Sequence, residues 1–87
     1  MRFVVEWKKT AIDELTALWL IADSAGRTAI TVAARDIDRL LQADPHAQGE
    51  SRESDRRVMF VRPLAAAFRI DSRTSRVDVL RIWQFER

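Results

Sequence analysis

The spacing of apolar residues changes its period twice along this chain, and this change limits the possible folds more than any other feature. Phe3, Val5 and Trp7 recur with a period of two, which predicts a first strand that ends near Lys8. The stretch from 10 to 42 has a helical period, and the stretch from 58 to 85 returns to the period of strands. The predicted order is one strand, two helices and three strands.

Two helices are predicted, over about 10–22 and about 27–42. Thr10 with acidic residues after it is typical of a helix N-terminus, and the break at 23–26 supplies N-cap residues for the second helix. Apolar residues mark one face of each predicted helix: Ala11, Leu15, Leu18, Trp19 and Ala22 in the first, and Ile30, Ala33, Ala34, Ile37 and Leu41 in the second. Pro45 ends the second helix, because proline disfavours helical geometry in the residue before it. The two helices should form an antiparallel hairpin.

The second half of the chain predicts a loop and a three-stranded antiparallel meander. Residues 43–57 show no periodicity, so we expect a loop of about fifteen residues there. The strands follow at 58–61, 64–71 and 77–85, with a polar turn between the last two. This pattern predicts an α+β domain over 1–87, in which the helical hairpin covers one face of the sheet in two layers.

The first strand of this meander is apolar on both faces, although helices can cover only one. Met59 and Val61 lie on one face of it, and Ala65 and Ala67 of the next strand are assigned to the same face as small side chains beside a shallow groove. An exposed apolar patch of this kind usually marks a protein interface. We therefore expect a partner to cover it, or the isolated protein to form a homodimer.

Composition narrows the classes of function. Fifteen Lys and Arg face thirteen Asp and Glu, and all of these cations except Lys8 and Lys9 are arginine, the better side chain for phosphate or carboxylate. There is no Cys, and His46 is the only His, so neither a disulfide nor a metal site is expected. No cofactor motif is present. No apolar run is long enough for a membrane span or signal segment, so we expect a cytoplasmic protein.

The order and spacing of these patterns resemble a known family over essentially the whole chain. The matching segments are Phe3-x-Val5-x-Trp7, Gly49-Glu50-Ser51-Arg52, Phe68-Arg69-Ile70-Asp71 and Val77-x-Val79-Leu80-x-Ile82-Trp83. The sequence thereby resembles the RelE/ParE superfamily, the toxins of bacterial type II toxin–antitoxin pairs. The resemblance implies a cognate antitoxin that lies across the sheet and helices, and a target in translation or DNA gyrase. The residues that the antitoxin would contact are Met59, Val61, Ala65 and Ala67.

Some members of that superfamily are ribosome-dependent mRNA endonucleases, which surround the scissile phosphate with cations. The candidates for such a catalytic group here are Arg62, Arg69, Arg81, Arg87 and His46. The sequence departs from this branch, because it contains no Tyr and has alanines at 65–67, where an arginine is usual. An endoribonuclease and a degenerate, non-toxic interaction module therefore remain alternatives to a toxin that acts through protein contacts.

Four arginines are candidates for binding a phosphate or the target: Arg52, Arg57, Arg69 and Arg81. Each also has an ordinary structural explanation. The acidic residues between positions 50 and 55 could neutralise the loop arginines on a solvated surface. Asp71 and Asp78 could be cross-strand partners of Arg69 and Arg81. The sequence does not decide between these two roles.

Overall fold

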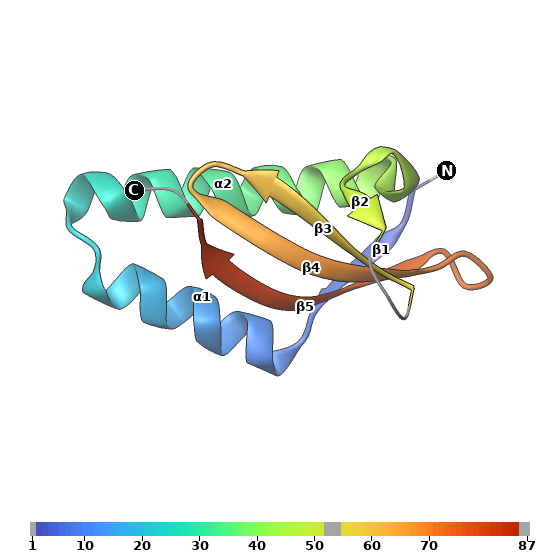
Figure 1. Ribbon diagram of the computed structural model, residues 1–87, viewed down its shortest axis with the longest axis horizontal. Coiled ribbons are helices and arrows are strands. Elements are labelled where there is room, and N and C mark those ends of the chain that lie inside the picture. The colour runs from blue at the N-terminus through green and yellow to red at the C-terminus, as the bar shows by residue number, and fades with distance from the viewer. Residues whose placement is uncertain (1, 52–54, 86–87) are drawn as a thin grey trace.

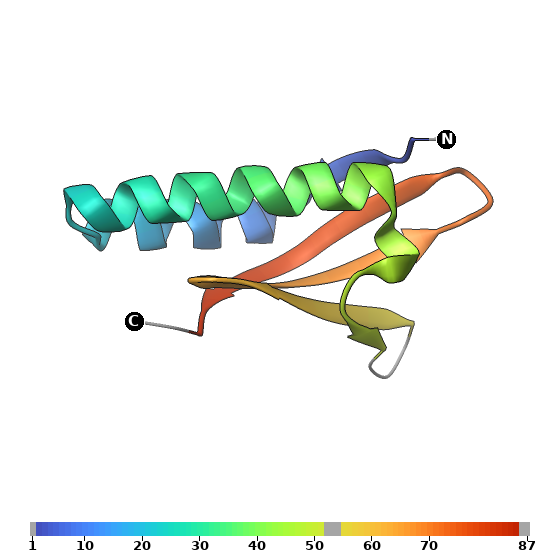
Figure 2. The same ribbon diagram turned by 90° about the horizontal axis from the view of Figure 1, so that it is seen from above.

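A single sheet with two helices packed against it makes up this computed structural model, which describes residues 2–51 and 55–85 (Figure 1). The elements in chain order are β1 (Val4–Trp7), α1 (Lys9–Ile21), α2 (Ser24–Ala43), the short 3-10 helix η1 (Pro45–Ala47), β2 (Glu50–Ser51), β3 (Arg56–Val61), β4 (Leu64–Asp71) and β5 (Arg76–Gln84). Figure 2 shows the helices in one layer and the strands in the other. The predicted two-layer α+β class and the order of the elements are confirmed.

The order of the strands brings the two ends of the chain together. The sheet runs β1-β5-β4-β3-β2, so the first strand lies beside the last one. β1 is parallel to β5, while β3, β4 and β5 pair antiparallel in sequence. A parallel pair needs a long crossover, which the helical hairpin and the rest of the sheet supply. The sheet is therefore mixed, with an antiparallel meander at its centre as predicted.

The core lies between the helices and β4 and β5. Phe68 of β4 is fully buried at the centre of this core. The four preceding residues of β4, Leu64 to Ala67, are buried too. Ile37 and Leu41 of α2 lie against this layer and are fully buried. The apolar face predicted for the second helix is therefore the face that packs on the sheet, because it removes most apolar area from water.

The two helix starts differ from the prediction. α1 begins at Lys9, and its N-cap residue Lys8 makes no side-chain cap, so Thr10 lies inside the helix and the capping signature was wrong. α2 begins at Ser24, earlier than predicted, because Asp23 accepts a hydrogen bond from the Gly26 N–H at 2.8 Å. Among the described residues, no helix is long and apolar enough to cross a membrane.

The segment predicted as an irregular loop contains ordered backbone. Gly49 has a φ of 68°, and a Cβ at this position would lie 2.4 Å from the Val58 carbonyl oxygen, so only glycine fits against β3. Arg57 fixes the segment from the other side. Its guanidinium donates to the carbonyl oxygens of Gln48 and His46, at 3.2 and 3.1 Å, and to a Ser51 hydroxyl. The prediction of a loop throughout 43–57 was therefore wrong, because η1, β2 and the start of β3 lie within it.

Candidate functional site

One face of the sheet has no helix over it (Figure 2), and this uncovered side is called the open face here. Because successive side chains of a strand point to opposite faces of the sheet, the residues that face the core also show which residues lie on the open face. Met59, Ala66 and Ile82 belong to the core beneath the helices, so their neighbours point the other way. The side chains that this places on the open face of the three central strands are Val58, Phe60, Ala65, Ala67 and Trp83.

Three aromatic side chains dominate one end of the open face, and they are called the aromatic patch: Phe60, Trp83 and Phe85. Phe60 pairs in register with Ala65, which pairs in turn with Trp83, so the two rings flank the alanine on one row. The rings of Phe60 and Phe85 meet edge to face with centroids 4.9 Å apart. Phe60 is 54% exposed, and Trp83 and Phe85 are each 39% exposed. Such a patch of large exposed apolar rings is typical of a protein interface.

The register corrects the predicted partner surface. Met59 and Val61 were assigned to the same face as Ala65 and Ala67, but they point toward the helices, and Met59 is only 3% exposed. Ala65 and Ala67 do lie on the open face, opposite Phe60 and Val58, but they are only 0% and 7% exposed, so they form no open groove for a partner. Because side chains alternate along a strand, a one-residue error of assignment moves the whole set to the other face. The sequence could not decide this, since the strand is apolar on both sides.

Ion pairs occupy the other end of the open face. Asp78 is at their centre, with cationic nitrogens of Arg69, Arg76 and Lys8 at 3.3, 3.6 and 3.8 Å from its oxygens. Glu6 adds a second carboxylate, which pairs with Lys8 and Arg76. Arg69 lies directly across from Asp78 in the register. The cross-strand interpretation of Arg69 is therefore supported, and the three cations of this cluster exceed its two carboxylates by one charge.

Arg81 also has an internal partner, which differs from the predicted one. β1 pairs with β5 only as far as Val79, and Glu14 of α1 reaches the exposed backbone beyond that point. Its two carboxylate oxygens accept the Ile82 N–H at 2.9 Å and the Arg81 Nε–H at 2.8 Å. The hydrogen bond from Arg81 lowers the pKa of Glu14, against the opposing effect of burial. Glu14 thus closes an open strand edge and neutralises Arg81.

This contact predicts a pH-dependent effect of Glu14→Gln. Because the pKa of Glu14 is lowered in the folded protein, its stabilising effect is complete above the ordinary glutamate pKa of about 4.3 and is lost as the pH falls through the lowered value. We expect a lower melting temperature than wild type at pH 7, with the difference shrinking toward pH 3. Asp36→Asn, which breaks the exposed pair with Arg39, is the matched control. A constant difference between Glu14→Gln and wild type from pH 7 to pH 3 would contradict the assignment.

The catalytic candidates within the described residues do not converge. His46 lies beside the turn after β4, where its Nε2 is 3.1 Å from the Ser72 hydroxyl, while Arg62 lies in the turn before β4. These turns are about 25 Å apart, because a strand rises about 3.4 Å per residue. Arg57, the candidate phosphate ligand, is bound to the preceding segment instead. The two remaining candidates, Arg52 and Arg87, lie outside the described residues.

Comparisons with known proteins agree on one fold. No protein-family model matches the chain, and no curated protein matches it by sequence. Among solved structures, a chain of the chromosomal ParDE toxin–antitoxin system of P. aeruginosa is similar with a TM-score of 0.77 and 22% identity, over 98% of each chain. A chain of the RelBE2 toxin–antitoxin complex of Mycobacterium tuberculosis has a TM-score of 0.69 and 20% identity, over 97% of this chain and 99% of that one. The intact E. coli RelBE complex contains a match with a TM-score of 0.62 and 15% identity, over 98% and 99%.

These likenesses cover nearly the full length of both partners in each comparison. The fold and the open face define a small two-layer α+β protein with an uncovered, aromatic sheet surface. More particularly, the chain has the RelE/ParE fold. The fold that the sequence resemblance implied is therefore confirmed.

Proposed function

We propose that this protein is the toxin of a type II toxin–antitoxin pair, and that a cognate antitoxin neutralises it by binding the open face. The aromatic patch is the observation that carries the proposal. The fold supports it, because the solved structures that it resembles include chains from ParDE and RelBE toxin–antitoxin systems. Those systems pair a toxin with an antitoxin, and we propose the same pairing for this chain.

The patch has the chemistry of a binding hot spot. Truncating an aromatic hot-spot side chain at the centre of an interface weakens binding by about 2 kcal/mol or more, because such a side chain buries a large rigid surface. Phe60 and Trp83 stand over Ala65, which presents no bulk of its own between them. Because Ala65 is itself fully buried, an apolar partner segment would lie on the exposed surface of the two rings and remove both from water.

We propose that the toxin binds its target, the ribosome or DNA gyrase, through protein contacts. Both targets are in the cytoplasm, where the protein would act. Arg69 and Arg81 are paired with Asp78 and Glu14, and His46 is at the far end of β4 from Arg62. This arrangement gives less support to an endoribonuclease, which needs a general base and several uncompensated cations around one phosphate.

Induced expression tests the proposed function. We expect growth arrest when the protein is expressed alone, and normal growth when the protein encoded by the adjacent gene is expressed with it. DNA supercoiling and the integrity of mRNA, measured in the same cells, would separate gyrase inhibition from mRNA cleavage. Normal growth with abundant, folded protein and no adjacent gene product would contradict a toxin and would favour a non-toxic interaction module.

A further inference from the structure

Two arginines face each other across neighbouring strands at the end of the open face away from the aromatic patch. Arg56 of β3 pairs in register with Arg69 of β4, and the alternation of both strands places them on the open face. Opposed side chains of neighbouring strands have Cβ atoms only about 4.5–5.5 Å apart, and like charges in such a pair destabilise the sheet. The folded protein therefore contains a repulsion here that a bound anion would relieve.

Arg56 has no partner of its own within the described residues. Its guanidinium makes neither a hydrogen bond nor an ion pair there, and its side chain is exposed. Arg69 is 3.3 Å from Asp78, but the same carboxylate also lies near Arg76 and Lys8. Asp78 is thus shared among three cations and does not offset the charge of Arg56.

The charges at this end of the sheet do not balance. The groups that lie together are four cations and two carboxylates: Lys8, Arg56, Arg69, Arg76, Glu6 and Asp78. Asp71, one row further along the sheet, accepts hydrogen bonds from the N–H groups of Arg73 and Thr74, so its carboxylate serves the turn after β4. The cluster therefore has an excess of two positive charges.

We propose that Arg56 and Arg69 bind a small phosphate monoester. Such a group has about two negative charges at neutral pH and three free oxygens. Each of the two planar guanidinium groups can donate paired hydrogen bonds to it. The dianion also matches the excess of two positive charges.

Other anions fit these two arginines less well. A carboxylate has two oxygens and one charge, so it fills the hydrogen-bonding fork of one guanidinium and leaves the other unneutralised. A phosphodiester of a nucleic-acid strand also carries only one charge. The paired arginines therefore favour a terminal phosphate over both.

This site is separate from the aromatic patch. Arg56 is four residues before Phe60 on β3, which corresponds to about 14 Å along the strand. A small phosphate monoester would therefore bind on the open face without covering the three rings. The register and the charges carry this assignment, and it does not depend on the proposed toxin activity.

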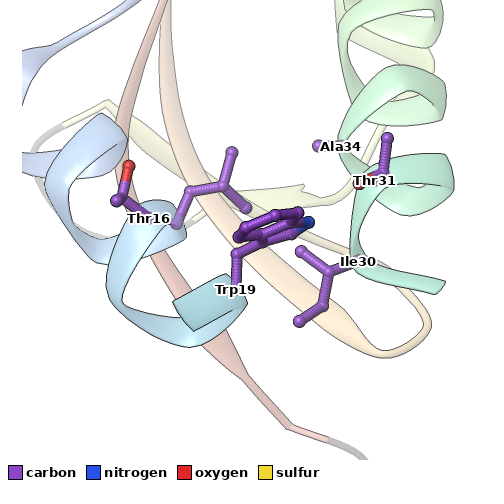
Figure 3. Close-up of a pocket in the computed structure, with 6 residues that line it drawn as sticks. Thr16, Trp19, Ile30, Thr31 and Ala34 are labelled. Atoms are coloured by element: carbon purple, nitrogen blue, oxygen red, sulfur yellow. The ribbon is translucent and has the colours of Figure 1, made fainter. Parts of the chain in front are cut away.

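The helical layer supplies a matched control, an unpaired arginine with no second arginine opposite it. A hollow of about 250 Å³ between α1 and α2 is lined mainly by apolar side chains (Figure 3). Trp19, which the sequence pattern placed on the buried face of the first helix, is 39% exposed at this hollow. Arg35 lines the neighbouring hollow, is exposed, and makes no ion pair or hydrogen bond within the described part of the chain. Arg27, which lines it too, lies over the Trp19 ring about two turns of α2 away.

Melting temperatures in chloride and phosphate buffers of equal ionic strength test the site. In chloride, Arg56→Gln should melt about 1–4 °C above wild type, because it removes the repulsion with Arg69, whereas Arg35→Gln should melt with wild type. In phosphate, wild type and Arg35→Gln should gain equally and Arg56→Gln should gain less, because inorganic phosphate binds the folded state through both opposed arginines. The general stabilising effect of phosphate is common to all three proteins and cancels in this comparison. Equal gains for wild type and Arg56→Gln would overturn the site.

An NMR titration with adenosine 5′-monophosphate, with adenosine as its control, tests the class of ligand. We expect the monophosphate alone to shift the backbone amide signals of Arg56 and Arg69. Arg56→Gln should weaken this binding at least fivefold, and Arg35→Gln should change it less than twofold. Equal shifts with adenosine would overturn the phosphate site. An RNA oligonucleotide with hydroxyl groups at both ends that bound more tightly than the monophosphate would show a nucleic-acid surface and would overturn the monoester.

Discussion

Phe68→Ala should remove about 3–5 kcal/mol from the free energy of unfolding, which is a large part of the roughly 5–10 kcal/mol available to a domain of this size. Phe68 is fully buried among side chains from both helices and three strands, so the cavity left by its ring cannot close without moving the sheet. We expect a substantial unfolded population at 37 °C. Urea unfolding followed by circular dichroism would measure the loss.

Phe60→Ala is the matched control for this prediction, because it makes the same chemical change in the same sheet. Phe60 is 54% exposed on the open face, so we expect its loss to change the unfolding free energy by less than about 1 kcal/mol. If both variants unfolded at similar urea concentrations, the faces of the sheet would be assigned wrongly.

The sequence predicted the fold well where one local signal was sufficient. The change from strand to helical and back to strand period needs only the spacing of apolar residues, and it placed every major element. The predicted start of α1 was wrong, because Thr10 follows the first helical residue and therefore cannot serve as the N-cap. The ordered backbone around Gly49 was also missed, since it depends on pairing with β3 rather than on its own periodicity.

The candidate site was predicted less well, because its geometry depends on contacts between distant positions. Glu14 and Arg81 are 67 positions apart, and no local pattern in the sequence joins them. The strand that contains Met59 is apolar on both faces. This pattern correctly predicted an uncovered apolar surface, but it did not show on which face of the sheet that surface lies. Phe60 and Trp83 lie on strands that β4 separates, and Phe85 follows the end of β5, so only the folded sheet brings the three rings together.

Phe60→Asp should have the largest effect on partner binding. It places a carboxylate at the centre of the aromatic patch, and an unpaired charge that a partner must desolvate costs several kcal/mol. We expect the dissociation constant for the antitoxin to rise at least a hundredfold. Since the Phe60 side chain is exposed, the variant should remain folded, with a melting temperature close to that of wild type.

Leu20→Asp is the matched control for the binding measurement. Leu20 is an exposed aliphatic residue of α1, at 61%, which does not belong to the aromatic patch. The same new charge at this position should change the dissociation constant only slightly. The pair of variants therefore separates a specific loss at the open face from a general effect of added negative charge.

Isothermal titration calorimetry of the wild-type protein, Phe60→Asp and Leu20→Asp with the product of the adjacent gene tests the central claim most directly. The account predicts tight binding by wild type and Leu20→Asp, and a dissociation constant at least a hundredfold higher for Phe60→Asp in a protein whose circular dichroism spectrum is unchanged. Equally tight binding by all three proteins would contradict the claim that the antitoxin neutralises this chain through the open face of its sheet.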